Sequence, residues 1–298
     1  MKKKILAMIL ACAMILALAA CSGSANTEQP AAEAPASDAA PAASAETPAA
    51  EGKTYTVGVC QLVQHEALDA ATQGFCDALT EALGDAVTID VQNASGDSVN
   101  CGTIVNGFVS KNVDLIMANA TPALTAAASA TADIPILGTS ITAYGVALDI
   151  ADFDGTVGGN ISGTSDLADL AAQAQMILDW FPDTQKVGLL FCSAEPNSRY
   201  QIEEVAKYLA DKGVETEEFA FTDTNDVASV TQSAADYADV VYIPTDNTAA
   251  ANTEAIGNVL IPAGVPAICG EEGICRGCGV ATLSISYYDL GVTTGKMA

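Results

Sequence analysis

Polar side chains follow several of the apolar, strand-like runs in this chain, and they include its single histidine. In a parallel sheet, ligands bind beyond the carboxyl ends of the strands, so the residues between each strand and its following helix are the informative ones. Six polar segments occupy such places and could line one cleft. The candidate ligand-binding residues are Gln61, His65, Asn119, Thr121, Thr139, Ser140, Ser193, Glu195, Asn197, Ser198, Thr245, Asp246, Asn247, Glu271 and Glu272.

Thr121 and Pro122 stand where a strand-like run passes into a helix-like one. Thr suits the N-cap of a helix and Pro its first position, so the pair predicts a helix start with outward-pointing backbone N–H groups. Such a helix end attracts carboxylates. The alternative is that Thr121 only caps its helix and that Thr139 and Ser140 only end a strand.

His65 raises the question of catalysis, with Cys60 or a serine as the nucleophile. The sequence has no Gly-x-Ser-x-Gly elbow, and Cys60 falls within a strand-like apolar run. We therefore predict that the protein is not an enzyme. His65 is then either a hydrogen-bonding residue of the cleft or a structural histidine of a loop.

Cys275-Arg276-Gly277-Cys278 is a CxxC pair, a spacing found in zinc sites and in local disulfides. A structural zinc site needs four ligands, and no second CxxC or neighbouring histidine is present, so we expect a local disulfide or two free thiols and no metal. Gly277-Cys278-Gly279 lacks the third glycine of a dinucleotide-binding loop, and no phosphate-binding lysine pattern occurs. The sequence therefore predicts no cofactor.

The amino-acid composition limits the kinds of molecule that the protein can bind. The chain has 298 residues, with 11 Lys and Arg against 37 Asp and Glu and a formal net charge of -26 at pH 7. This balance excludes most nucleic-acid binders, which neutralise phosphates with basic side chains. Hydrophobic residues make up 50% of the chain, which is enough for one large domain or two modest lobes.

The first 52 residues differ from the rest. Lys2 to Lys4 precede an apolar run from Ile5 to Leu18, which predicts a signal peptide over residues 1–20. Leu18-Ala19-Ala20-Cys21 resembles the bacterial lipobox, so we expect Cys21 to be lipidated and to anchor the exported protein to the membrane. An ordinary export signal with a coincidental cysteine is the alternative. Residues 21–52 comprise the lipidated Cys21 and an Ala- and Pro-rich linker.

From residue 53 onward, apolar strand-like runs alternate with amphipathic helix-like runs, a pattern typical of parallel sheets. The expected strands are 55–59, 87–91, 113–117, 134–137, 160–163, 187–191, 214–219, 240–243 and 267–268, and the expected helices are 67–83, 98–109, 122–130, 166–180, 197–210, 226–235 and 248–260. They form two Rossmann-like blocks. The predicted fold class is α/β, with two doubly wound lobes.

Five segments in order resemble the tryptophan/tyrosine-type substrate-binding lipoproteins of bacterial ABC transporters, which have the type I periplasmic-binding-protein fold. The resemblance covers roughly residues 54–298. Its most specific pieces are QHEALDAA at 64–71, VQNASGD at 91–97, ATPA at 120–123, PTDN at 244–247 and SYYDLG at 286–291.

The resemblance implies a receptor that captures a small solute, usually an amino acid, by hinge closure and delivers it to an ABC permease with its ATPase. Lobe 1 would comprise residues 53–163 plus 284–298, and lobe 2 residues 164–283. The hinge would include residues 161–165 and 283–286. The protein would sit on the outer face of the cytoplasmic membrane, or on its periplasmic side in a source with two membranes.

The resemblance also implies two poles for an amino acid. Thr121, Thr139 and Ser140 would receive the carboxylate, and the available acids for the ammonium are Asp246, Glu271 and Glu272. Glu272 is favoured, because Gly270-Glu271-Glu272-Gly273 is similar to a Gly-x-Glu-Gly turn of branched-chain amino-acid receptors. The alternative is that these acids are solvated loop charges.

The chain departs from the resemblance in three places. Glu66 stands where relatives commonly have Pro, and Tyr144 stands where many have Pro in a Thr-Asp-Pro segment. Tyr144 could stack on a ligand ring or cover the rim of the pocket. The chain stops at Ala298 within a helix-like run, where relatives continue, so a truncated C-terminus is expected.

Three other functions stay open at this point. The same fold could bind a sugar, a nucleoside or a peptide, and aromatic side chains above and below the ligand would favour a sugar. A ligand sensor without a transport role is the second. A secreted hydrolase is the third, and it would need a nucleophile and a base within hydrogen-bond reach in the cleft.

Overall fold

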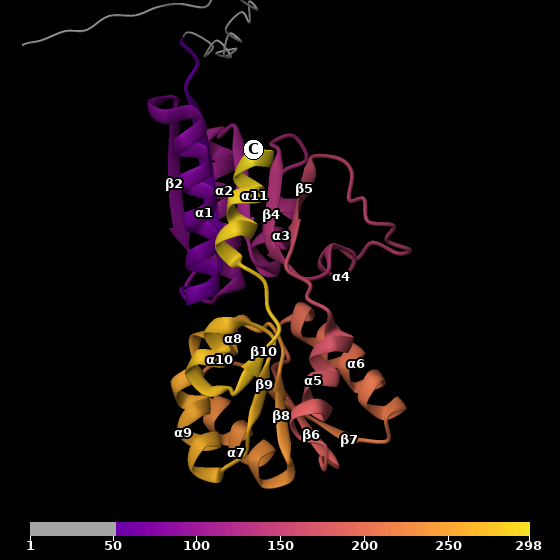
Figure 1. Cartoon of the computed structure of the whole chain (residues 1–298). Coiled ribbons are helices and arrows are strands. Elements are labelled where there is room, and N and C mark those ends of the chain that lie inside the picture. Colours follow the sequence, from indigo (N-terminus) through magenta and orange to yellow (C-terminus); the bar gives the residue numbers. More distant parts are fainter. Residues whose placement is uncertain (1–51) are drawn as a thin grey trace, which may run out of the picture. The chain divides into compact units, whose positions relative to one another are not determined.

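The computed structural model describes residues 52–298, so the predicted signal peptide, the lipid site at Cys21 and nearly all of the linker lie outside the described residues. The described residues all lie in one compact unit. It contains two five-stranded sheets whose neighbouring strands are all parallel. This confirms the predicted fold class of two doubly wound α/β lobes (Figure 1).

Lobe 1 is built on the sheet β2-β1-β3-β4-β5. Its strands are β1 (Tyr55–Gln61), β2 (Val87–Asn93), β3 (Leu115–Asn119), β4 (Ile136–Ile141) and β5 (Ile161–Ser165). Its helical elements are α1 (Glu66–Leu83), the 3-10 turn η1 (Gly84–Ala86), α2 (Ser98–Lys111), α3 (Thr121–Ala130), α4 (Tyr144–Ala147) and α11 (Tyr287–Met297). The strand order reverses direction between β1 and β3, which is where such sheets bind ligands.

Lobe 2 is built on the sheet β10-β9-β8-β6-β7. Its strands are β6 (Lys186–Cys192), β7 (Glu215–Phe221), β8 (Val240–Ile243), β9 (Ala267–Cys269) and β10 (Ala281–Thr282). Its helices are α5 (Leu170–Trp180), α6 (Pro196–Asp211), α7 (Val227–Tyr237), α8 (Asn247–Ala251), α9 (Thr253–Ala263) and α10 (Glu272–Cys278). The order reverses between β6 and β8, so both lobes have the same type of binding edge.

Each sheet is buried on both faces, as the continuous apolar runs predict. In lobe 1, Phe75 and Leu79 of α1 pack against one face, and Phe108 of α2 with Leu124 of α3 packs against the other. In lobe 2, α5 and α6 cover one face, and α7, α9 and α10 cover the other. The helices therefore hold the strand ends in fixed positions.

The last helix, α11, returns to lobe 1 and packs beside α1, although the two are far apart in the sequence (Figure 1). Two glycines allow this close approach. A Cβ atom on Gly74 would collide with the carbonyl oxygen of Tyr288, and one on Gly291 would collide with that of Ala71. The two helix backbones are thus nearly in contact. Helix α11 begins at Tyr287 because Ser286 caps it, accepting the N–H of Asp289 at 3.2 Å.

Three expected elements differ from the structure. Residues 166–169 form a connecting segment instead of a first helical turn, because Asp169 caps α5 by accepting a hydrogen bond from the N–H of Ala172 at 2.9 Å. The expected helix 248–260 is two helices that meet at Asn252. Residues 161–165, expected within the hinge, pair with β4 as strand β5. The lobes are connected by residues 166–169 and, as expected, by residues 283–286.

Among residues 52–298, no helix combines the length and the apolar character that crossing a membrane would require.

Candidate functional site

An enclosed cavity of about 10 Å³ lies where the strand ends of the two lobes meet. Its wall comes from segments that follow β1, β4, β5, β6, β8 and β9, and from the start of α11. The lining residues are His65, Ala67, Leu68, Ser140, Thr142, Asp166, Asn197, Thr245, Asp246, Asn247, Ala250, Glu271 and Tyr287. The space suffices for about one water molecule. The lobes therefore enclose the site, and a solute can enter only if they separate.

His65 lies at this cavity and is held by a chain of hydrogen bonds. The Glu195 carboxylate accepts the backbone N–H and the side-chain amide of Asn247, at 3.0 and 2.7 Å. The amide oxygen of Asn247 is thereby turned toward Nε2 of His65, at 3.3 Å. Burial lowers the pKa of His65, so its ring is neutral near pH 7. We assign the proton to Nε2, which leaves the buried Nδ1 as a free acceptor.

Two more polar atoms at the cavity have no hydrogen-bond partner among the described residues: Oγ of Ser140 and Oδ1 of Asn197. Ser140 lies at an irregularity in the pairing of β4 with β5 and has a left-handed backbone with φ of 55°. That conformation is uncommon for a residue other than glycine, and such bulges re-aim side chains next to binding sites. Buried polar atoms normally have partners, so these two atoms are available to a ligand or a water in the cavity.

Three buried carboxyl groups face the same cavity: Asp166, Asp246 and Glu271 are 4%, 1% and 2% exposed. Burial raises the pKa of Asp166 and of Glu271. Burial and then repulsion from Glu195 raise the pKa of Asp246 to about 8. Of the described residues that line the cavity, none is Lys or Arg. The carboxyl groups thus lack a cationic partner, which a ligand with an ammonium group would supply.

The fold holds two of these acids at helix starts. Asp246 caps α8 by accepting the N–H of Ala249 at 2.7 Å, and it also accepts the N–H of Cys192 at 2.7 Å. Glu271 caps α10 by accepting the N–H groups of Gly273 and Ile274, at 2.7 and 2.5 Å. These bonds use part of each carboxylate and leave the remaining lone pairs for a ligand.

The N-terminal end of α1 lies at the cavity, since Ala67 and Leu68 belong to its first turn. His65 occupies the N-cap position but makes no side-chain capping bond. The first N–H groups of a helix have no partner within the helix, so this end favours an anionic group. The unpartnered hydroxyl of Ser140 lines the same cavity. Together they form a site suited to a carboxylate.

The structure brings seven of the fifteen sequence-predicted residues to the cavity: His65, Ser140, Asn197, Thr245, Asp246, Asn247 and Glu271. The other eight do not line it: Gln61, Asn119, Thr121, Thr139, Ser193, Glu195, Ser198 and Glu272. Most of these eight lie at strand ends as expected, but their side chains bond to other parts of the protein.

Four of the eight belong to lobe 1, and the side chains of three of them form hydrogen bonds within it. Gln61 donates to Asp69 at 2.7 Å, and Asn119 donates to the carbonyl of Leu68 at 2.9 Å. Thr139 accepts a hydrogen bond from Thr294 of α11 at 3.1 Å. Thr121 is the first residue of α3 and its N-cap is Ala120, so the predicted start is displaced by one residue. Thr121 lines a separate groove with Pro122, away from the cavity.

In lobe 2, Ser193 is exposed and donates to the carbonyl of Phe221 at 3.1 Å. Ser198 is fully buried and accepts a hydrogen bond from Asn197 at 3.3 Å. Glu195 acts through Asn247, as described above. These residues position the cavity wall.

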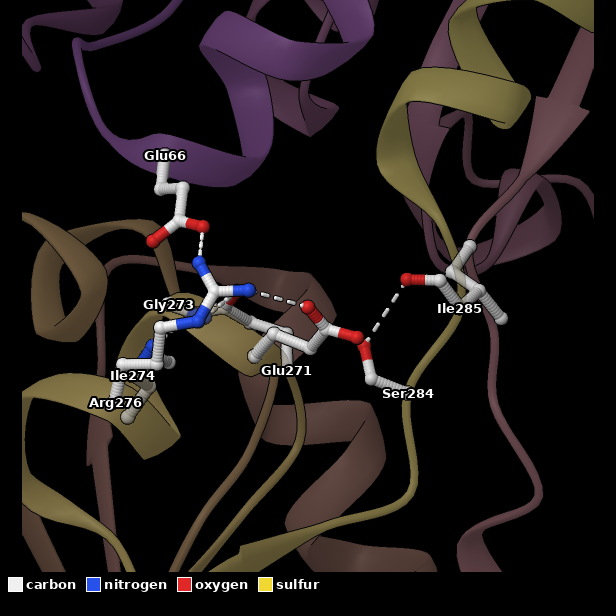
Figure 2. A network of polar contacts seen from close by, with 8 residues as sticks. Glu66, Glu271, Gly273, Ile274, Arg276, Ser284 and Ile285 are labelled. Atoms are coloured by element: carbon white, nitrogen blue, oxygen red, sulfur yellow. Dashed lines mark hydrogen bonds and ion pairs between the residues drawn. The ribbon is translucent and has the colours of Figure 1, made fainter.

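Glu272, the favoured ammonium partner, is exposed and bonds to Arg276 at 2.7 Å. Adjacent residues at a helix start point in different directions, so only Glu271 of this pair faces the cavity. Arg276 also forms an ion pair with Glu66 of lobe 1, and Figure 2 shows its guanidinium reaching from α10 toward the start of α1. This is an ion pair between the two lobes.

Six lining residues were not predicted from the sequence: Ala67, Leu68, Thr142, Asp166, Ala250 and Tyr287. Two of them, Asp166 and Tyr287, could have been found from features of the sequence. Asp166 comes directly after a strand, although it was assigned to a helix, and Tyr287 lies within the segment 286–291 that carries the resemblance. Tyr144 neither stacks in the cavity nor covers its rim, because its hydroxyl is buried and donates to the carbonyls of Gly138 and Thr164.

Residues 56–298 match the family described as ABC transporter substrate binding protein. A tyrosine-binding protein of Clostridioides difficile (strain R20291) is 33% identical over 249 residues, which is 83% of this chain and 72% of that protein. A structure from Streptococcus pneumonia, described as an ABC domain in complex with L-Trp, is 32% identical and has a TM-score of 0.79. That comparison covers 82% of this chain and 83% of the other.

A second solved structure differs in conformation. It is the ligand-free, open structure of a substrate binding protein with adhesive properties from Clostridium difficile. It is also 32% identical, with 82% and 83% of the two chains covered, but its TM-score is 0.59. The present structure resembles the L-Trp complex more closely, in agreement with its enclosed cavity.

Proteins of this family bind a small-molecule solute outside the cytoplasm and work with ABC permeases, and they are not enzymes. The match over residues 56–298 and the 33% identity to a curated relative establish the family of this chain. It belongs to the ABC transporter substrate binding proteins.

Proposed function

We propose that this protein captures an aromatic L-amino acid for import and delivers it to an ABC permease. The cavity supports this proposal most directly. Its wall presents three buried carboxyl groups and three unpartnered acceptor or hydroxyl atoms, and none of the described residues that line it is Lys or Arg. An ammonium group supplies the hydrogen-bond donors and the positive charge that this set lacks.

The two ends of the amino acid have distinct places in this proposal. The ammonium lies among Asp166, Asp246 and Glu271, with Glu271 taking the role that the sequence assigned to Glu272. The carboxylate lies at the start of α1 and bonds to the hydroxyl of Ser140, instead of lying at the start of α3. The other sequence-predicted lining residues complete the polar wall.

The choice of an aromatic side chain draws on the relatives, one named for tyrosine and one solved with L-Trp. The apolar part of the wall comes from Ala67, Leu68, Ala250 and the ring of Tyr287. Small alanine side chains leave room for a large ligand group once the lobes separate. Closure of the lobes around the ligand would then yield the form that docks on the permease.

The predicted export and lipid anchor complete the proposal. A signal peptide over residues 1–20 and a diacylated Cys21 would hold the receptor beside its permease. Metabolic labelling with an alkyne fatty acid is expected to mark the wild-type protein and not Cys21→Ser. Equal labelling of both would exclude Cys21 as the lipid site.

Calorimetric titration of the purified protein tests the ligand. L-Trp and L-Tyr are expected to bind, whereas tryptamine, which lacks the carboxylate, and indole-3-propionate, which lacks the amine, should each bind at least about tenfold more weakly. Sugars, nucleosides and short peptides complete the panel. Binding confined to one of those classes, or binding of both truncated analogues as tightly as L-Trp, would reject the amino-acid proposal.

Reconstitution of the protein with its cognate permease and ATPase separates transport from sensing. Import of labelled L-Trp that requires the binding protein is the expected result. Tight binding without any dependence of import on the protein would favour a sensor instead.

A further inference from the structure

Three of the cysteines in lobe 2 lie together next to the ligand cavity. Cys269 ends β9, and Cys275 and Cys278 both lie on α10. Cys269 and Cys278 are buried and Cys275 is half-buried. None of the seven cysteines that residues 52–298 contain is in a disulfide. Glu271, which faces the cavity, lies in the turn between Cys269 and Cys275.

The Cys269 sulfur lies against the backbone of α10. A Cβ atom built on Gly279 would collide with this sulfur, and it would also lie 3.0 Å from the Cα atom of Cys275. The Cys269 sulfur is therefore a neighbour of the Cys275 backbone, and a disulfide between the two residues requires this proximity.

Cys275 is the more reactive of the two cysteines on α10. The neighbouring Cys269 thiol lowers the pKa of Cys275 to about 7, despite the nearby Glu271 and Glu272. A thiolate is the nucleophile in thiol–disulfide exchange. Cys278 is buried, and its thiol donates to the carbonyl of Ile274 at 3.3 Å.

We propose that Cys269 and Cys275 form a redox-active dithiol, which a small organic disulfide converts into an internal disulfide. The Cys275 thiolate attacks one sulfur of the reagent, whose S–S bond breaks and releases one thiolate. The Cys269 thiol then loses its proton and attacks the Cys275 sulfur, which releases the second thiolate. Both released thiolates take up protons, so two cysteines are oxidised and one disulfide reagent is reduced to two thiols.

The new bond would close a short loop, 270–274, that carries Glu271 and leads into α10. This loop presents a carboxylate of the proposed ligand site, so its redox state would change ligand affinity. ABC substrate-binding proteins work outside the cytoplasm, where disulfides form and persist. Formation of the disulfide does not depend on the proposed function, whereas its effect on affinity does.

Peptide mapping tests the pairing. The purified protein is incubated with oxidised glutathione, alkylated with N-ethylmaleimide and digested with trypsin. Because Lys212 and Arg276 are successive trypsin sites, Cys269 and Cys275 fall in one peptide, 213–276, and Cys278 falls in the next. We expect peptide 213–276 to lose two hydrogens and take up no alkylating agent, while Cys278 is alkylated.

Two variants complete the test. Cys275→Ser should abolish the internal link, and Cys76→Ser, which replaces a half-buried cysteine on α1, should retain it. Oxidation should raise the thermal midpoint by about 5 °C in the wild type and in Cys76→Ser only. Full alkylation of peptide 213–276, a stable glutathione adduct on it, or a link to Cys278 would each overturn the proposal.

Affinity for L-Trp is then compared between the oxidised and reduced protein. A change of at least about threefold that dithiothreitol reverses is expected. If the disulfide forms and the affinity is unchanged, its coupling to the site is rejected. If L-Trp binds neither form, the proposed function fails while the mapped disulfide stands.

Discussion

Tyr287 donates a hydrogen bond of 2.9 Å from its hydroxyl to Asp166, and this bond joins the two chain segments that connect the lobes. Asp166 begins the first connection after β5, and Tyr287 follows the second at the start of α11. The other oxygen of Asp166 accepts a hydrogen bond from Thr142 at 2.9 Å. Since all three residues line the cavity, the connections and the ligand site share one network.

Replacement of Tyr287 by Phe should weaken this network. The buried carboxyl of Asp166 would lose one of its donors, so we expect the free energy of unfolding to fall by about 1–3 kcal/mol. Urea denaturation measures the change. Tyr288→Phe is the matched control, because its hydroxyl donates to Asp77 at 3.1 Å on an exposed surface. Equal losses in both variants would contradict a special role for Tyr287.

Glu271 and Glu272 should differ sharply in their effect on ligand binding. Glu271→Gln keeps the shape of the side chain but removes its charge from the cavity, so we expect the Kd for L-Trp to rise about 10- to 100-fold. Glu272→Gln changes an exposed residue and should alter the Kd less than about twofold. Isothermal titration measures both. A larger effect of Glu272→Gln would restore the assignment made from the sequence.

Stability of the unliganded protein should fall as pH rises. The pKa of Asp246 is raised to about 8 from its ordinary value of 3.8. Below pH 4 the carboxyl is protonated in both the folded and the unfolded state. Above pH 4 only the unfolded state ionises readily, so stability is lost as pH rises toward 8. The raised pKa of Asp166 and of Glu271 acts in the same direction.

Thermal unfolding between pH 5 and pH 9 measures this dependence. Asp246→Asn removes one of the titrating groups and should show a shallower decline than the wild type. Parallel curves for the two proteins would mean that Asp246 is ionised in the folded state throughout this range.

Ligand binding should release protons near pH 7. A bound ammonium favours the charged form of neighbouring carboxyl groups, so it lowers the raised pKa values of Asp246 and Glu271. Titrations in buffers of different ionisation enthalpy report the number of protons released. Affinity should rise as pH increases toward 8. Proton uptake on binding would contradict the assignment of the ammonium to these acids.

The ion pair between Arg276 and Glu66 should favour closure modestly. Both side chains are largely exposed, so Arg276→Gln is expected to weaken L-Trp binding by no more than about fivefold and to enlarge the unliganded protein in small-angle scattering. Arg199→Gln is the control, because Arg199 pairs with Glu218 at 3.3 Å within lobe 2. High salt should remove the difference between wild type and Arg276→Gln.

The fold could be predicted from the sequence because its signals are local. Apolar runs such as 187–191 are buried on both faces of a parallel sheet, and their alternation with amphipathic helices defines the doubly wound pattern. The predicted helix bounds were wrong where a single side chain decides the helix start. Asp169 caps α5, so this helix begins later than the hydrophobic periodicity indicates. The close approach of α1 and α11 depends on Gly74 and Gly291, and the hydrophobic periodicity of the sequence does not predict this contact.

Only part of the candidate site could be predicted from the sequence. Strand ends are recognisable in the sequence, and seven predicted residues reach the cavity from them. Which of two adjacent side chains faces the ligand depends on the direction of the backbone, and this separates Glu271 from Glu272 and Ser140 from Thr139. The network of Asp166, Thr142 and Tyr287 joins residues more than a hundred positions apart. The sequence alone thus determined the α/β architecture and the binding edges, whereas only tertiary packing decided which side chains meet there.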